Sequence, residues 1–329
     1  MSEQNTSPSE DKVASTRSDD LPTDIVNRLA FAALNEQRRT RRWNIFFKGL
    51  FFAYFLIILL MIYLPVDSSK KLTTGKHTAL VEVNGIIADN TAANADSIIS
   101  GLRDAFEDRD TAGVILRINS PGGSPVQSGY VNDEIARLRN ENPDIKVYAV
   151  VTDICASGGY YIAAAADEIY ADKASIVGSI GVLMNSFGFV DAMKKLGVER
   201  RLYTAGENKG ILDPFSEAKP EDINHVKGML GNIHEQFIDV VKKGRGDRLV
   251  ENKDIFSGLF WTGEQAMELG LVDALGSSSY VAREVIQAEK IINFTPKETY
   301  LERFADRFGA AMANTMMKVI GVNQTPVAK

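Results

Sequence analysis

The stretch "AGVILRINSPGGSPVQSGYVNDEIARLRN", residues 112–140, decides the fold class. It opens with a short apolar run between polar residues, which is typical of a buried β-strand. A Ser-Pro-Gly-Gly-Ser turn ends that run, and the pattern from Pro125 to Asn140 predicts a helix. Residues 112–140 are therefore predicted to form a strand–turn–helix unit, the repeating element of α/β domains.

The same alternation continues on both sides of this unit, from about residue 78 onward. Further strands are predicted at "TALVEVNGII" (78–87), "IKVYAVVTD" (145–153), "EIYAD" (168–172), "VGSIGVLMN" (177–185) and "VERRLYTAG" (198–206). Further helices are predicted at "NADSIISGLRDAFED" (94–108), "ASGGYYIAAAA" (156–166), "VDAMKKLG" (190–197) and "KPEDINHVKGMLGNIHEQFIDVVKKGR" (219–245). Asn94 or Asp96 is the expected cap of the first of these helices. Strands separated by helices predict a largely parallel sheet with helices on its faces.

Composition excludes several classes of protein. The 329-residue chain is 45% hydrophobic and 24% charged, with a net charge of −6, so it lacks the basic face of a nucleic-acid-binding protein. Its single cysteine, Cys155, cannot form an intramolecular disulfide. Three histidines, His77, His225 and His234, are too few and too scattered for a zinc site. We expect no metal and no cofactor.

The N-terminal region has its own organisation. Residues 1–25 are rich in polar residues and are predicted to be disordered, and residues 26–42 could form a short basic helix. An apolar segment follows at 44–66, with Lys48 as its single charge. The part from Gly49 to Val66 carries no charge and has about the minimum length for crossing a bilayer core. We therefore predict a transmembrane anchor.

A cleaved signal peptide is the competing interpretation of this segment. It would have a shorter apolar core and would end in a small-residue cleavage site, which "MIYLPVDSS" (61–69) does not offer. A retained anchor is therefore favoured. Basic residues crowd its N-terminal flank and are sparser beyond it, so the tail is predicted to be cytoplasmic and the rest extracytoplasmic. The flanking residues are Arg38, Arg39, Arg41, Arg42 and Lys48 before, and Lys70, Lys71 and Lys76 after.

The C-terminal segment "TYLERFADRFGAAMANTMMKVIG" (299–321) has the periodicity of an amphipathic helix. Its apolar residues recur at three- and four-residue spacing: Leu301, Phe304, Phe308, Met312 and Met316. This helix could pack on the domain, on a neighbouring subunit or on the membrane surface.

Two glycine-rich corners are candidates for chemistry. In "DICASGGYYIAAAAD" (153–167), Cys155 and Ser157 are possible nucleophiles at a helix start, and the amide of Gly158 faces the same space. An amide from the Ser-Pro-Gly-Gly-Ser turn could complete an oxyanion hole with it. Simpler alternatives remain open, because Ser157 is equally well explained as a helix N-cap and the turn as an ordinary βα connection.

A serine nucleophile needs a base, and the scattered histidines make a Ser-His-Asp triad improbable. A lysine whose charged form is disfavoured by burial can take that role. Lys209, in "TAGENKGILDPFSE" (204–217), lies in a glycine-rich loop followed by apolar residues. A solvated surface lysine is the alternative, and the residues alone favour it.

Five segments together resemble the signal peptide peptidase (protease IV) family of membrane-anchored serine proteases. In order they are "INSPGGS", "ASGGYYIAAAAD", "VGSIGV", "GENKGILDPF" and "WTGEQAMELGLVDALG", and the resemblance covers roughly residues 78–290. The single copy of the domain is similar to the short form of the family. The resemblance implies a crotonase/Clp-peptidase-like α/β fold and assembly into dome-like rings in which neighbouring subunits complete each active site.

The resemblance also implies roles for individual residues. Ser157 corresponds to the nucleophile, Lys209 to the general base, and Ser179 to a serine that orients the lysine. Gly158 corresponds to one oxyanion donor, and Gly123 or Ser124, in the turn that begins at Gly122, to the other. Cys155 has no catalytic counterpart. Two residues depart from the family pattern, and they concern the substrate pocket only: Leu259 stands where arginine is frequent, and Asn208 where an aromatic is usual.

The expected organisation is a tail, an anchor, a linker, a peptidase domain and a C-terminal segment, at 1–43, 44–66, 67–77, 78–290 and 291–329. The expected activity is endoproteolysis of apolar peptides such as cleaved signal peptides, at the inner membrane, by a homo-oligomer. One alternative is an acyl-CoA hydratase or isomerase of the same superfamily. Another is a catalytically inert membrane scaffold that keeps the fold.

Overall fold

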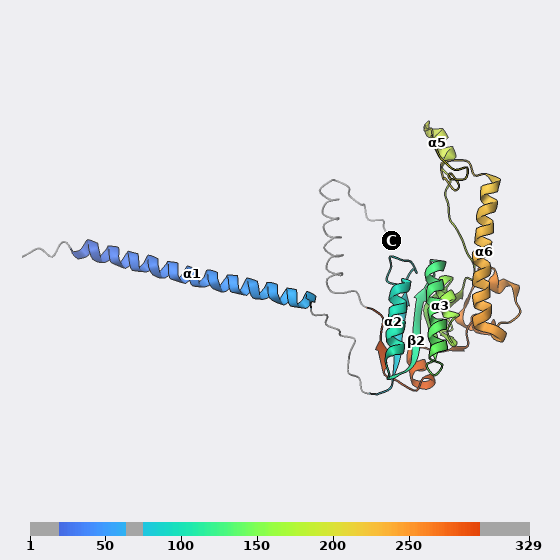
Figure 1. Ribbon diagram of the computed structural model, residues 1–329, viewed down its shortest axis with the longest axis horizontal. Coiled ribbons are helices and arrows are strands. Elements are labelled where there is room, and N and C mark those ends of the chain that lie inside the picture. Colours follow the sequence, from blue (N-terminus) through green and yellow to red (C-terminus); the bar gives the residue numbers. More distant parts are fainter. Residues whose placement is uncertain (1–19, 64–74, 297–329) are drawn as a thin grey trace, which may run out of the picture. The chain divides into compact units, whose positions relative to one another are not determined.

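The computed structural model describes residues 20–63 and 75–296 (Figure 1). Helix α1 and an α/β domain belong to two separate compact units, which divide between Lys70 and Lys71. Most of the predicted linker and the amphipathic helix at 299–321 lie outside the described residues.

Helix α1 is continuous from Asp20 to Tyr63. It joins the basic helix and the apolar segment predicted separately at 26–42 and 44–66, because the sequence between them contains no glycine or proline. The prediction of disorder up to residue 25 is wrong for residues 20–25, which are helical. Pro22 does not prevent this, because it lies in the first turn, where proline is tolerated. Among the described residues, no helix is long and apolar enough to cross a membrane. The last three residues of the 44–66 segment are outside them.

The α/β domain is built on one eight-stranded sheet. Its strands are β1 (His77–Asn84), β2 (Thr111–Ser120), β3 (Val147–Ala156), β4 (Glu168–Ala171), β5 (Ile176–Gly178), β6 (Phe260–Thr262), β7 (Ala274–Leu275) and β8 (Ile291–Asn293). The main path runs β6-β5-β3-β2-β1-β8, while β4 pairs with β3 and β7. Every pairing is parallel except that of β5 with β6. The predicted α/β class with a parallel-rich sheet is confirmed, and β8 extends the sheet past residue 290.

Helices cover the two faces of the sheet unequally. The main core joins one face to α2, α3, α4 and α6, whose bounds are Ala95–Glu107, Pro125–Glu141, Gly158–Ala163 and Pro220–Arg245. A smaller cluster on the other face joins Leu80, Ile115 and Val150 to Val281 and Ala282, in the helical turns that follow α8 (Ser278–Tyr280). The strands alternate between the two clusters, as a sheet buried on both faces requires.

The segment from residue 181 to 219, here called the arm, differs most from the prediction. The strand expected at 198–206 is absent, and the one expected at 177–185 ends at Gly178. No residue from 181 to 236 is buried, and Tyr203 is 88% exposed. Strand-forming side chains need neighbouring strands to pack against, and the arm has none in the part of the chain that the structure describes. In Figure 1, its helix α5 (Val190–Leu196) lies well away from the sheet, beyond the outer end of α6.

The opposite end of α6 is fixed to the domain by a buried arginine. Arg245 is 1% exposed, donates to both carboxylate oxygens of Asp273 at 2.8 and 2.9 Å, and donates to the Gly270 carbonyl at 2.9 Å. Beside it, Gly244 lies against α4 so closely that a Cβ atom there would be 1.9 Å from the Ala164 carbonyl oxygen. The helix that follows the arm is thus anchored to the domain through its C-terminal half.

Two alanine substitutions in α6 test this anchoring. Gly244→Ala is expected to lower the free energy of unfolding by about 1–3 kcal/mol, since the added methyl overpacks the contact with α4. Gly231→Ala is the matched control, because a Cβ there meets nothing within 4 Å, and it is expected to stabilise the protein by about 0.5–1 kcal/mol. Denaturant unfolding measures both, and equal effects of the two changes would contradict the close contact.

Candidate active site

Ser157 lies at the corner between β3 and α4 in an unusual backbone conformation. Its φ is 51° and its ψ is −121°, a sparsely populated combination for a residue with a side chain. The Ser157 amide donates to the Gly178 carbonyl at 2.8 Å, and its carbonyl accepts from the Tyr161 amide at 2.9 Å. These two hydrogen bonds hold a conformation that costs about 1–3 kcal/mol, and such strain clusters at functional sites.

The Ser157 hydroxyl does not serve as a helix cap. Asn94, Ser124 and Thr262 each accept a hydrogen bond from the first turn of the helix they precede, whereas the Ser157 side chain accepts none. Nothing else in the part of the chain that the structure describes is hydrogen-bonded to this hydroxyl. The N-cap alternative therefore loses its basis, and the Ser157 oxygen is available to a substrate.

The Ser-Pro-Gly-Gly-Ser turn packs directly on this corner. A Cβ atom on Gly122 would lie 2.7 Å from both the Gly158 nitrogen and the Ser157 Cβ atom. Gly122 also has a φ of 100°, which favours glycine. A Cβ atom on Gly158 would lie 2.5 Å from the Ser128 hydroxyl and 3.2 Å from the Gly123 nitrogen. The two corners predicted from sequence are thus in van der Waals contact.

The hydrogen bonds of the turn distinguish its three amides. The Ser124 amide donates to the Ile87 carbonyl at 2.7 Å, and the Gly122 amide donates to the Ser120 hydroxyl at 3.1 Å. The Gly123 amide donates to no group among residues 20–63 and 75–296, and neither does the Gly158 amide at the start of α4. Two unpaired backbone donors therefore lie beside Ser157, one from each corner. The bond to Ile87, 37 positions earlier in the chain, could not be predicted from the motif.

Ser179 lies next to Ser157 across the sheet. Ala156 of β3 pairs with Gly178 of β5, so the two serines directly follow paired residues, on strands that are about 4.8 Å apart. Ser179 also has a positive φ, 53°, and its amide donates to the Leu259 carbonyl at 2.7 Å. The structure therefore brings Ser157, Ser179 and the two unpaired amides together.

Lys209 is not part of this assembly within one chain. It lies in the exposed arm, where its amide donates to the Gly206 carbonyl at 3.2 Å, and no contact joins it to Ser157 in the described structure. Its ammonium group forms no ion pair with a described residue. A single chain thus presents the predicted base to solvent.

Two other side chains clarify the site. Cys155 is fully buried in the main core, and burial raises the pKa of its thiol, so it is not a competing nucleophile. His234, on α6, contacts the segment after Ser179 through Nε2, which lies 3.2 Å from the Ile180 carbonyl oxygen. Sequence reasoning missed this contact, since His234 lies 54 positions from Ile180 and carries no motif.

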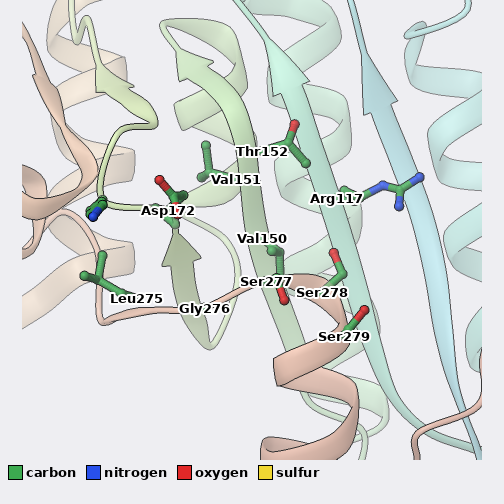
Figure 2. A pocket seen from close by; sticks show the side chains of 12 residues that line it. Arg117, Val150, Val151, Thr152, Asp172, Leu275, Gly276, Ser277, Ser278 and Ser279 are labelled. Atoms are coloured by element: carbon green, nitrogen blue, oxygen red, sulfur yellow. The ribbon is translucent and has the colours of Figure 1, made fainter.

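A separate cavity of about 440 Å³ lies against the sheet, and Figure 2 shows its lining. Val150, Val151 and Thr152 of β3 line one side, and Ser277, Ser278 and Ser279 line another, with none of the predicted site residues among the lining. The Arg117 side chain reaches past the cavity toward β1, where it pairs with Glu82. The cavity is therefore distinct from the corner around Ser157.

An available serine on a strained strand-to-helix turn, with two backbone amides beside it, is an arrangement typical of serine hydrolases. Comparison with known proteins narrows this class. Residues 139–292 match peptidase family S49. A putative signal peptide peptidase SppA of Enterococcus faecium is 31% identical over 230 residues, 68% of this chain and 66% of that protein. A putative protease of Synechocystis is 34% identical over 207 residues, 63% of this chain and 72% of that protein.

The chain belongs to peptidase family S49. The chain is also similar to two proteins with a different name, the Na(+)/H(+) antiporters NhaA of Brucella melitensis and Brucella abortus, and is 54% identical to each over 175 residues. These residues are 53% of this chain and 24% of either antiporter, so the chain spans about a quarter of their length.

The burial of Cys155 has a direct chemical consequence. In the native protein, the thiol is expected to resist alkylation by iodoacetamide at neutral and mildly alkaline pH, because the reactive species is the thiolate. Denaturant should make the same thiol react at the rate of an ordinary cysteine. Mass spectrometry of both samples measures the difference, and rapid alkylation of the folded protein would show that the thiol is accessible.

Proposed function

We propose that this protein is a serine endopeptidase that uses Ser157 and Lys209 as a catalytic dyad. The observation that carries the proposal is the strained, uncapped Ser157 beside the two unpaired amides of Gly123 and Gly158. Membership of family S49 supports it. In this proposal Ser179, which is adjacent to Ser157 across the sheet, orients the lysine once Lys209 reaches the corner.

The chemistry follows from these groups. The Ser157 oxygen attacks the carbonyl carbon of the peptide bond while neutral Lys209 takes the hydroxyl proton. The amides of Gly158 and Gly123 stabilise the oxyanion, and Gly123 is preferred over Ser124 because the Ser124 amide is bonded to Ile87. Lys209 then protonates the leaving amine. It next takes a proton from the water that attacks the acyl-enzyme, and it returns that proton to the Ser157 oxygen as the acyl–oxygen bond breaks and the new carboxyl group is released.

We propose further that Lys209 reaches the serine of a neighbouring subunit in a ring or dome. The exposed arm supports this, because an isolated chain leaves many of its large apolar side chains in water. Among them are Leu183, Phe187, Leu196, Val198 and Tyr203. Packing these side chains against a second copy would bury them and, at the same time, bring Lys209 to the serine of that copy.

The proposed substrates are apolar peptides such as cleaved signal peptides. The similarity to a protein named as a signal peptide peptidase supports this class, and so does the apolar character of the arm. We also propose that the domain has a crotonase/Clp-peptidase-like fold. The family motifs suggest this fold, and the order of strands and helices agrees with it.

We also propose that residues 44–66 anchor the protein in the inner membrane, with the tail cytoplasmic and the peptidase domain extracytoplasmic. The uncharged stretch from Gly49 to Val66 and the arginines before it support this orientation.

Substitution of either dyad residue tests the mechanism. Ser157→Ala and Lys209→Met are each expected to lower kcat on an apolar fluorogenic peptide by about 10⁴-fold or more, as removal of a nucleophile or its base does in other serine peptidases. Lys195→Met, also in the exposed arm, is the matched control and should keep full activity. Substantial activity in Ser157→Ala would reject the dyad.

Mixing the two inactive chains tests the shared site. Assemblies that contain both Ser157→Ala and Lys209→Met subunits are expected to recover part of the wild-type activity, because an intact serine can then meet an intact lysine from its neighbour. Refolding the chains together and assaying peptide cleavage measures this. No recovery in mixed assemblies of native size would place both residues in one subunit, and a catalytically inert scaffold would show no wild-type activity at all.

The proposed anchor makes a separate prediction. The full chain expressed in bacteria should remain in the membrane pellet after alkaline carbonate extraction, and a chain lacking residues 1–66 should not. Protease added to spheroplasts should digest the peptidase domain and spare the tail. Release of the full chain by carbonate would contradict the anchor.

A further inference from the structure

Ser120 is a buried polar residue that the proposed mechanism does not use. It is the last residue of β2, just before the turn that carries Gly122 and Gly123, and it is 0% exposed. A buried hydroxyl without hydrogen bonds is costly, so its partners indicate what it does.

The Ser120 hydroxyl links two backbone groups. It donates to the Gly85 carbonyl at 2.6 Å and accepts from the Gly122 amide at 3.1 Å. Gly85 belongs to the segment after β1. Two residues later, the Ile87 amide donates to the Gly122 carbonyl at 2.9 Å, and the Ile87 carbonyl accepts from the Ser124 amide at 2.7 Å. The turn is thus fixed to the 85–87 segment on both sides of Gly123.

This arrangement sets the direction of one amide. The peptide plane between Gly122 and Gly123 contains the Gly123 N–H and the Gly122 carbonyl, which accepts from Ile87. On the other side of Gly122, its own amide donates to the Ser120 hydroxyl. Both glycines have a positive φ, 100° at Gly122 and 154° at Gly123. Glycines populate many conformations, so hydrogen bonds rather than side-chain sterics must hold this peptide in place.

Ser120 also contacts the second corner. A Cβ atom on Gly159, the second residue of α4, would lie 3.1 Å from the Ser120 carbonyl oxygen and 3.4 Å from its Cβ atom. Ser120 therefore touches the turn that carries the Gly123 amide and the helix start that carries the Gly158 amide. No other serine of the described chain is bonded to the turn's Gly122 amide.

We propose that Ser120 is a positioning residue that aims the Gly123 amide at the oxyanion. This rests on the proposed serine peptidase function and adds to it a residue that does not touch the substrate. Preorganised donors contribute to catalysis only when they point to where charge develops in the transition state. Loss of the Ser120 hydroxyl frees the Gly122 amide and the Gly85 carbonyl, and the flexible glycine pair can then turn away.

The test compares Ser120→Ala with wild type in the full-length protein. Removal of one oxyanion donor costs about 10²–10³ in kcat, so loosening one is expected to cost about 10–100-fold, with KM nearly unchanged. A peptide boronate, which mimics the tetrahedral intermediate, should bind more weakly by a similar factor. A peptide amide that binds only as a ground-state competitor should keep its affinity.

Two further variants separate positioning from stability. Thr78→Val is the matched control, because Thr78 is equally buried and donates to the Ala288 carbonyl at 2.7 Å, on β1 away from the corner. It should lower the melting temperature as Ser120→Ala does and leave kcat and boronate affinity unchanged. Ser120→Cys keeps a weak donor and acceptor of similar size, so its kcat should lie between those of wild type and Ser120→Ala.

Each outcome decides the proposal. Wild-type kcat and boronate affinity in folded Ser120→Ala would overturn it, and so would an equal loss of kcat in Thr78→Val. If Ser120→Ala does not fold, wild-type kinetics in Ser120→Cys overturn the proposal and an intermediate kcat with weakened boronate binding supports it. Activity that persists in Ser157→Ala would instead reject the proposed function, which keeps the two failures distinguishable.

Discussion

The site depends on the contact between two glycine corners that leave no space for side chains. A Cβ atom on Gly123 would lie 2.0 Å from the Ile87 carbonyl oxygen, and one on Gly122 would meet the Gly158 nitrogen at 2.7 Å. The backbones of β2 and β3 can therefore end side by side with their next amides facing one region. Parallel strands place such ends at the same edge of a sheet, so the topology brings the two corners together. The glycines then allow the two backbones to approach closely enough for contact.

Much of this could be predicted from the sequence because the signals are local. The apolar run before residue 120 predicts β2, and the candidate caps Asn94 and Asp96 predict the start of α2. The segment 156–166 predicts α4, which is shorter than expected and ends at Ala163. The prediction failed where the structure of a segment depends on the other segments that pack against it. The segment at 198–206 has the composition of a strand, but no strand among the described residues lies beside it, and β-propensity expresses packing more than an intrinsic backbone preference.

The site residues divide in the same way. A serine between alanine and two glycines is recognisable as a motif, whereas its φ of 51° and its uncapped hydroxyl are visible only in the structure. The choice between the Gly123 and Ser124 amides depends on Ile87, which no local pattern marks. Lys209 shows the limit most clearly, since the motif marks its place in the chain while the described structure of one chain leaves it exposed and away from Ser157.

The burial of Cys155 also makes the arm accessible to spectroscopy. Because the chain has one cysteine and that thiol is enclosed in the core, a cysteine introduced on the arm would be the only thiol that a maleimide dye or spin label reaches. The native sequence therefore needs no prior removal of cysteines. The freedom of motion of the labelled arm could be followed in the otherwise unaltered protein, with and without added peptide.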